Sequence, residues 1–130
     1  MKQDIPQVIK DVGFDFSWDN NKVWNLDISV TEMAMQDLIW HFDIPFLCDK
    51  DGVYNLTPSE VLNDTDRYES EHKRVLEANM NYPIDIMKNK GRWLILDGLH
   101  RLMKASMSGL NSVKVRIVPI ERIPDIRVDI

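Results

Sequence analysis

The first half of the chain alternates apolar and polar residues in two different periods. Residues 14–18 and 22–26 alternate with the two-residue period of a strand. The Asn20-Asn21 pair between them is typical of a turn, so we predict a β-hairpin with its tip near residues 19–21. Farther along, Met35, Leu38, Ile39 and Phe42 have helical spacing. This pattern predicts an amphipathic helix that begins near Thr31 and ends before Pro45.

The second half of the chain carries clearer boundary signals. Thr57-Pro58-Ser59-Glu60 has the form of a capping box with proline at the first helical position. Gly109 is expected to end a helix, because glycine readily adopts the left-handed backbone conformation found at helix ends. The predicted elements are a short helix after Thr57, a helix from Glu69 to Met80 with Val75, Leu76 and Met80 facing inward, a hairpin of residues 84–87 and 93–96, a helix from Leu99 to Ser108, and a strand over residues 113–118.

This order of elements predicts an α/β (α+β) fold, in which helices pack on a small mixed sheet. The chain has 130 residues, enough for one domain with its own core. We expect residues 1–53 to form an N-terminal extension, made of the hairpin and the amphipathic helix, that packs on a domain of residues 54–130 as one compact unit.

Charge is unevenly distributed along the sequence. The formal net charge is −5 and the isoelectric point is about 5.1. Residues 1–50 hold 9 acids and 4 bases, whereas residues 51–130 hold 12 of each. An acidic balance argues against a dedicated DNA-binding surface, because affinity for DNA depends mainly on neutralising phosphates. The acidic segment is either a solvated face or a modulator of anionic ligands.

The single cysteine, Cys48, has no partner for an internal disulfide, which suits a cytoplasmic protein. The first residues have no apolar core after their charges, so they do not resemble a signal peptide. No apolar run approaches the roughly 20 residues that span a bilayer.

The densest chemical signal is the pentapeptide Asp97-Gly98-Leu99-His100-Arg101, between an apolar strand and a helix. Glycine at such a junction allows a ligand to approach the backbone closely. The first turn of the helix presents unpaired N–H groups and a positive dipole end. His100 and Arg101 add donors there, so the segment is built like an anion or phosphate site.

Each candidate residue also has a structural interpretation. Asp97 either caps the helix or holds Mg²⁺ or accepts a hydroxyl proton, as phosphoryl transfer requires. His100 either donates to phosphate and moves a proton or is a half-buried structural histidine. Arg101 either pairs with a phosphate or with Asp97. Acids are favoured at a helix start by the dipole alone, so Glu69 and Glu71 are either such residues or a general base or metal ligand.

His41 lies in the Trp40–Pro45 patch of the predicted extension. It either enters the phosphate site or is a helix-end histidine over a tryptophan.

From Tyr54 onward, the motifs resemble the ParB/sulfiredoxin-like superfamily. The resemblance spans residues 54–119 and includes the Thr57 helix start, the Tyr82-Pro83-Ile84 segment and the Gly-x-His-Arg core after a strand. It implies a fold in which this loop and helix start bind nucleotide phosphates, with Gly98, Leu99, His100 and Arg101 as contacts. It also implies a phosphate- or substrate-facing role for Arg67.

The family includes CTP-hydrolysing partition proteins, ATP-dependent sulfinic acid reductases and free-serine kinases. Leu99 stands where the reductases have their catalytic cysteine, which argues against that reaction. The partition proteins have Gly-Glu-Arg-Arg here, so Leu99 and His100 replace an acid and an arginine. Kinase-like members use several histidines in the loop, and this one has only His100.

The function predicted from these residues is binding of a nucleoside di- or triphosphate with Mg²⁺, as a phosphotransferase or nucleotidase acting on a small-molecule or protein hydroxyl. Asp97, His100, Glu69 and Glu71 are then the catalytic candidates, and Asp97 is the metal ligand. The alternative is a non-catalytic protein-interaction or DNA-partition-associated module, which the apolar Leu99 favours. A third alternative, a ParB-like nuclease, is opposed by the acidic charge.

Overall fold

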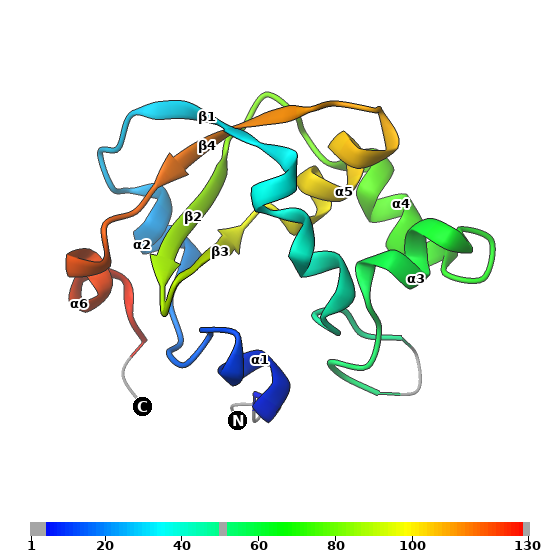
Figure 1. Cartoon of the computed structure of the whole chain (residues 1–130), viewed down its shortest axis with the longest axis horizontal. Helices are drawn as coiled ribbons and strands as arrows, with labels where there is room; N and C mark the ends of the chain where they lie inside the picture. The colour runs from blue at the N-terminus through cyan, green and yellow to red at the C-terminus, as the bar shows by residue number, and fades with distance from the viewer. Residues whose placement is uncertain (1–4, 50–51, 129–130) are drawn as a thin grey trace.

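A four-stranded mixed sheet lies at the centre of the structure (Figure 1), a computed structural model that describes residues 5–49 and 52–128. The strand order is β1-β4-β2-β3. β2 is antiparallel to β3 and parallel to β4, and β1 is antiparallel to β4. The strands are β1 (Val30–Ala34), β2 (Ile84–Asn89), β3 (Arg92–Asp97) and β4 (Ser112–Ile117). The fold is therefore mixed α/β, as the sequence predicts.

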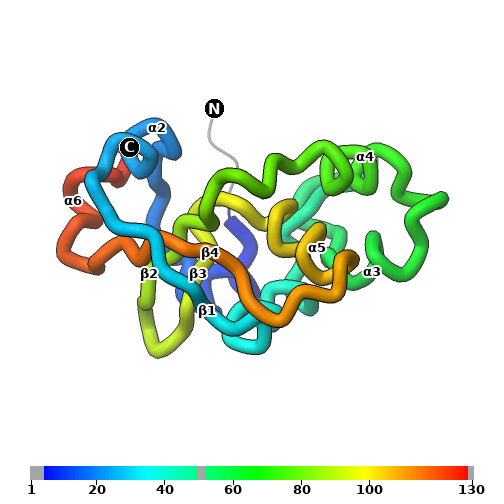
Figure 2. The backbone as a smooth tube through the Cα atoms, turned by 90° about the horizontal axis from the view of Figure 1, so that it is seen from above, coloured from blue at the N-terminus to red at the C-terminus, as the bar shows by residue number. Residues whose placement is uncertain are grey.

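The helices gather at the two ends of this sheet. α3, α4 and α5 lie at one end, and α2 and α6 lie at the other (Figure 2). The helices are α1 (Gln7–Asp11), α2 (Asn20–Trp24), α3 (Pro58–Asn63), α4 (Glu69–Glu77), α5 (Leu99–Met107) and α6 (Ile123–Ile126), with 3-10 turns η1 (Met35–Asp37), η2 (Ile39–Asp43) and η3 (Ile120–Arg122). None of the helices in the described ranges has the length and apolar content that crossing a bilayer requires.

Strand β2 lies inside the sheet, where it pairs with β4 along one edge and with β3 along the other. Side chains of other elements cover both of its faces. Ile84 and Ile86 belong to the largest core cluster, with side chains of α3, α4 and α5. Met87 points to a second cluster with Val23 of α2 and Ile126 of α6. α2 and α6 thus pack on one face of β2, and α3, α4 and α5 contribute to the core on its other face.

Several predicted elements are confirmed. Thr57 caps α3 in a capping box with Glu60, since each residue's side chain accepts a hydrogen bond from the other's backbone N–H. The β2–β3 hairpin, α5 and β4 follow the predicted boundaries within two residues. Gly109 has φ +72°, the left-handed conformation expected after α5.

The predicted hairpin over residues 14–26 is wrong, because Asp19 starts a helix instead of a turn. Its carboxylate accepts a hydrogen bond from the Asn21 N–H at 2.8 Å and caps α2. Residues of this type favour both turns and helix caps. Burial of Val23 against β2 and α6 favours the helix over the turn, so tertiary contacts add to the local cap.

The predicted amphipathic helix over residues 31–44 is also wrong. Residues 30–34 form the edge strand β1, and two 3-10 turns follow. Met35, Leu38 and Phe42 are buried as expected, whereas Ile39 is exposed. Apolar residues about three positions apart also suit 3-10 turns, which have three residues per turn, so the spacing alone did not separate the two structures.

Helix α4 begins at Glu69 as predicted but ends at Glu77, short of Met80. Val75 is fully buried, whereas Leu76 and Met80, which were expected to face inward, are exposed. The helix therefore has a narrower apolar face than its sequence suggests.

Candidate functional site

Gly98 joins the end of β3 to the start of α5 in a conformation that side chains disfavour. Its φ is +114° and ψ is 21°, and no side chain caps the helix. The first N–H groups of α5 have no intrahelical acceptor. A helix of nine residues thus starts with its donors and positive dipole end uncapped by any side chain.

Replacing Gly98 by alanine is expected to lower the free energy of unfolding by about 2 kcal/mol, because it adds a clash to backbone strain. A Cβ there would lie 3.1 Å from Ile84 Cγ1 and 3.2 Å from Arg101 Nη1. Gly109→Ala is the matched control: its φ is +72° and no atom lies within 4 Å of a Cβ. We expect Gly109→Ala to lower the free energy of unfolding by about 1 kcal/mol. Urea unfolding measures both, and equal losses would contradict the proposed crowding.

The uncapped helix start opens into a groove of about 470 Å³. All five residues from Asp97 to Arg101 line this groove. The facing wall comes from the end of α4 and the residues after it, including Arg74 and Asn79. Lys104 of α5 holds this wall in place, since its Nζ donates to the carbonyl oxygens of Leu76 and Ala78 at 2.8 and 3.0 Å.

Arg101 and Asp97 form a pair at the edge of the groove. Arg101 Nη1 lies 3.7 Å from Asp97 Oδ2 and donates to the carbonyl of Pro83 at 3.0 Å. Asp97 Oδ2 also accepts a hydrogen bond from the indole N–H of Trp24 at 2.8 Å. Both charged side chains are about one-fifth exposed. Asp97 is therefore held in place by its neighbours and does not cap α5.

His100 is bound to Glu71 across the two helices. Its Nε2 lies 2.7 Å from Glu71 Oε2, and Arg74 Nη1 donates to the other carboxylate oxygen of Glu71 at 3.2 Å. The side chains of His100 and Glu71 are 22% and 12% exposed, so water reaches the pair only in part. Glu71, one of the two acidic candidates on α4, thus meets the pentapeptide directly.

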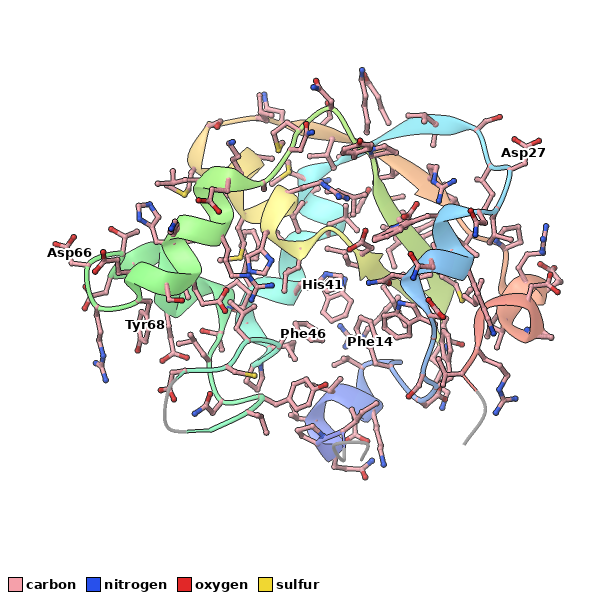
Figure 3. The ribbon with its side chains drawn as sticks, turned by 180° about the vertical axis from the view of Figure 1, so that it is seen from behind. Phe14, Asp27, His41, Phe46, Asp66 and Tyr68 are labelled. Carbon is pink, nitrogen blue, oxygen red and sulfur yellow. The ribbon has the colours of Figure 1, made fainter. Side chains whose placement is uncertain are left out.

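Arg67 and Glu69 line a different cavity, which they share with Cys48 and Tyr68. The guanidinium of Arg67 lies 5.3 Å from the centre of the Tyr68 ring. Figure 3 shows Tyr68 and Asp66 toward the end of the molecule that holds α3 and α4, away from His41 in the centre. Of the eight predicted site residues, the structure gathers Asp97, Gly98, Leu99, His100 and Arg101 around the groove and joins Glu71 to them through its bond to His100. Arg67 and Glu69 lie in the other cavity, which Glu71 also lines.

The described residues contain no group of three or more His, Cys, Asp or Glu side chains placed to hold a metal ion. Magnesium in nucleotide sites is commonly held by one or two carboxylates together with the phosphates. Asp97 and Glu77 are carboxylates that line the groove. Asp97, which directly precedes the uncapped helix start, fits this role better, although it already accepts the Trp24 hydrogen bond.

His41 does not enter the groove. It is buried between Phe14 and Phe46 (Figure 3) and stacks on Trp40 with ring centres 3.8 Å apart. Its Nδ1 lies 2.7 Å from the Leu38 carbonyl, and its Nε2 accepts from the Ile95 N–H at 3.0 Å. Burial lowers the pKa of His41 to about 4. The structural alternative, a histidine over a tryptophan, is thus the one observed.

Two features near the groove were not predicted. Asp85 of β2 is 3% exposed, and Arg116 of β4 donates to its Oδ1 at 2.6 Å. An aspartate between isoleucines in an apolar strand is a signal that sequence inspection can find. Trp24, which bonds Asp97 from 73 positions away, has no such signal.

Comparisons with known proteins show neither a family nor a function for this chain. No family model matches the chain, and no curated protein matches it. A search of solved structures found similarity to sulfiredoxin from Arabidopsis thaliana, with 13% identity over 74% of this chain and 93% of that chain, and a TM-score of 0.37. The evidence for a phosphate site is therefore the geometry of the groove.

Proposed function

We propose that the groove at the start of α5 binds the phosphate groups of a nucleoside di- or triphosphate. The observation that carries this proposal is the uncapped helix start at Gly98, where a Cβ would crowd Ile84 and Arg101. Backbone N–H groups and the helix dipole favour an anion there. The groove volume of about 470 Å³ is within the range of small-molecule sites.

The charged side chains of the groove support a phosphate ligand. Arg101 and Arg74 are the cations that line it, together with His100 and the acids Asp97 and Glu77. An arginine can pair with a phosphate through two parallel hydrogen bonds. Among phosphate ligands, the resemblance of the Gly-x-His-Arg segment to nucleotide-binding proteins supports a nucleotide, and Asp97 would hold the Mg²⁺ that accompanies it.

A phosphotransferase or nucleotidase reaction is the finer form of this proposal. His100 lines the groove and can accept a proton from an attacking hydroxyl or water, because its bond to the Glu71 carboxylate orients the ring. Magnesium would neutralise charge on the transferred phosphate. In this form Asp97 would hold the metal and Arg101 would stabilise charge on the phosphate.

Replacing Arg101 by alanine is expected to weaken nucleotide binding roughly 10-fold or more, since a hydrogen bond to a charged group contributes about 1.5–3 kcal/mol. Isothermal titration calorimetry with ATP, ADP and CTP, each with and without Mg²⁺, measures this loss. Arg122→Ala is the control, because it removes the same charge from an exposed pair with Asp125. Absence of binding by all three nucleotides to the wild-type protein would refute the proposal.

A second candidate function is a non-catalytic protein-interaction module. It is favoured by the internal pairing of the charged groups, since Arg101 bonds Pro83 and His100 bonds Glu71. His100→Ala separates the two functions. It should weaken nucleotide binding or turnover under the first and leave capture of a protein partner unchanged under the second.

A further inference from the structure

A second cavity, of about 620 Å³, adjoins the phosphate groove. Asp97 and Arg101 line both, so the two spaces meet along this pair. The wall of the second cavity is otherwise largely aromatic and apolar, with Trp24, Val30, Tyr82 and Pro83. A ligand that passes over the Asp97–Arg101 pair therefore leaves a charged groove and enters an aromatic cavity.

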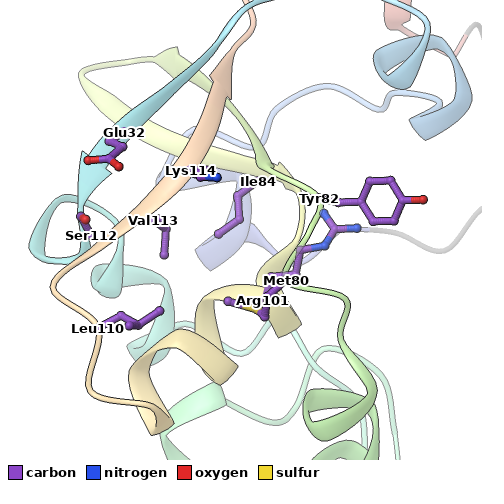
Figure 4. Close-up of a pocket in the computed structure, with 9 residues that line it drawn as sticks. All are labelled: Glu32, Met80, Tyr82, Ile84, Arg101, Leu110, Ser112, Val113 and Lys114. Carbon is purple, nitrogen blue, oxygen red and sulfur yellow. The ribbon is translucent and has the colours of Figure 1, made fainter.

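The two aromatic rings of this cavity are exposed yet held at its charged edge. Trp24 is 53% exposed and Tyr82 is 62% exposed, although large aromatic side chains usually bury most of their surface. The Trp24 indole N–H is bonded to Asp97, and the Arg101 guanidinium lies 5.7 Å from the centre of the Tyr82 ring. Figure 4 shows the Tyr82 ring extending away from the β4 residues, with the end of Arg101 beside it.

Arg116 fixes the position of Trp24 through the backbone of the neighbouring residues. Its Nη1 and Nη2 donate to the carbonyls of Leu26 and Val23 at 2.9 Å each, so the backbone on both sides of Trp24 is tied to β4. Its Nε donates to Asp85. A ring held in this way loses little freedom when a ligand stacks on it, which favours binding.

The charges around the cavity cancel. Asp85 is paired with Arg116, and Asp97 with Arg101. A paired, formally neutral lining suits an uncharged planar ring better than an ion. The faces of Trp and Tyr stack on such rings regardless of their identity, because every nucleobase has a π face.

We infer that this cavity binds the base of the nucleotide whose phosphates occupy the groove, with Trp24 and Tyr82 as stacking surfaces. The inference rests on the proposed function, since the phosphates place the base. It adds Trp24, from the N-terminal part of the chain, and Tyr82 to the ligand contacts. Asp97 and Arg101 would lie where the sugar joins the two parts of the ligand.

Replacing Tyr82 by alanine tests this inference with little risk to folding, because the side chain is mostly exposed. We expect Kd for ATP to rise roughly 10-fold or more, as stacking contributes about 1–3 kcal/mol per base. Kd for inorganic tripolyphosphate should stay within about two-fold, since it has no base. Tyr82→Phe, which keeps the ring, should bind ATP as the wild type does. Calorimetry in the presence of Mg²⁺ measures these Kd values for the variants and for the wild type.

Two further variants complete the test. Trp24→Leu should weaken the binding of ATP more than the binding of tripolyphosphate. Ile120→Ala, which truncates another exposed apolar side chain, should change neither Kd. The base site is refuted if Tyr82→Ala raises Kd for both ligands equally, or if the wild type binds ATP no more tightly than tripolyphosphate. Phosphate binding would stand in either case. If neither ligand binds the wild type, both the base site and the proposed function fail.

Discussion

Replacing Arg116 by leucine is expected to lower the free energy of unfolding by about 4 kcal/mol, the largest single effect that the structure predicts. The guanidinium bonds the Asp85 carboxylate at 2.6 Å, and the two side chains are 12% and 4% exposed. Leucine would leave a buried carboxylate without its counter-charge. It would also remove the donors to the Val23 and Leu26 carbonyls, which attach α2 to the sheet.

The pKa of Asp85 indicates how poorly this position tolerates an unpaired charge. Burial raises the pKa of the Asp85 carboxyl, and the bond to Arg116 opposes that rise. Without Arg116 the pKa should rise further, so the variant should recover part of its stability as pH falls and Asp85 takes up a proton. Asp85→Asn in the same variant should also recover part of it, because no charge then remains buried.

Arg122→Leu is the matched control for this prediction. Arg122 Nε also lies 2.6 Å from a carboxylate, that of Asp125, but the two side chains are 43% and 53% exposed. Exposed pairs contribute about 0–1 kcal/mol because water screens them. Chemical denaturation followed by circular dichroism measures both variants. Similar losses in the two would show that burial of the Asp85–Arg116 pair does not matter.

Replacing His41 by leucine is expected to lower the free energy of unfolding by about 3 kcal/mol. The ring pairs two buried backbone groups, the Leu38 carbonyl and the Ile95 N–H. A carbonyl only accepts, so Nδ1 carries the proton, and Nε2, which accepts from Ile95, has none. Leucine would leave both backbone groups unpaired at about 1–3 kcal/mol each, offset in part by its apolar side chain. His72→Leu, at a half-buried position of the mostly exposed α4, should change the free energy of unfolding by about 0.5 kcal/mol or less.

His41 should also make the stability of the protein depend on pH. Its pKa is about 4 in the folded protein against an ordinary 6.5, because burial disfavours the charged ring. Below pH 6.5 the unfolded chain takes up a proton that the folded ring does not. The stabilisation is therefore complete above pH 6.5 and is lost as pH falls toward 4, a difference of about 3 kcal/mol.

Unfolding measured at several pH values between 4 and 7.5 checks this dependence. The His41→Leu variant should lack that part of the pH dependence which the wild type shows between 6.5 and 4. Identical slopes in the two proteins would mean that other groups cause it.

The elements with strong local signals could be predicted from the sequence. The capping box at Thr57, the hairpin of residues 84–87 and 93–96, and the Gly109 helix end each depend on residues close together in the chain. The same holds for the pentapeptide from Asp97 to Arg101, whose strand, glycine and helix are consecutive. Its five residues line one groove because they are consecutive in the chain and so lie close together.

The N-terminal part could not be predicted in the same way, because distant partners decide its structure. Residues 30–34 become strand β1 by pairing with β4, which lies about 80 positions later. Asp19 caps a helix because Val23 packs against β2 and α6. A short segment with ambiguous spacing takes the structure that its neighbours bury, and local propensity is too weak to oppose them.

The sequence by itself determined the mixed α/β class, the strand–glycine–helix junction and the residue types that an anion site needs. The tertiary structure alone decided how these residues are used. It placed Glu71 on His100, separated Arg67 and Glu69 from the groove, and brought Trp24 to Asp97. It also assigned His41 to the core. The physical reason is that backbone signals act over a few residues, whereas hydrogen bonds and burial act across the folded chain, between positions whose separation in sequence carries no pattern.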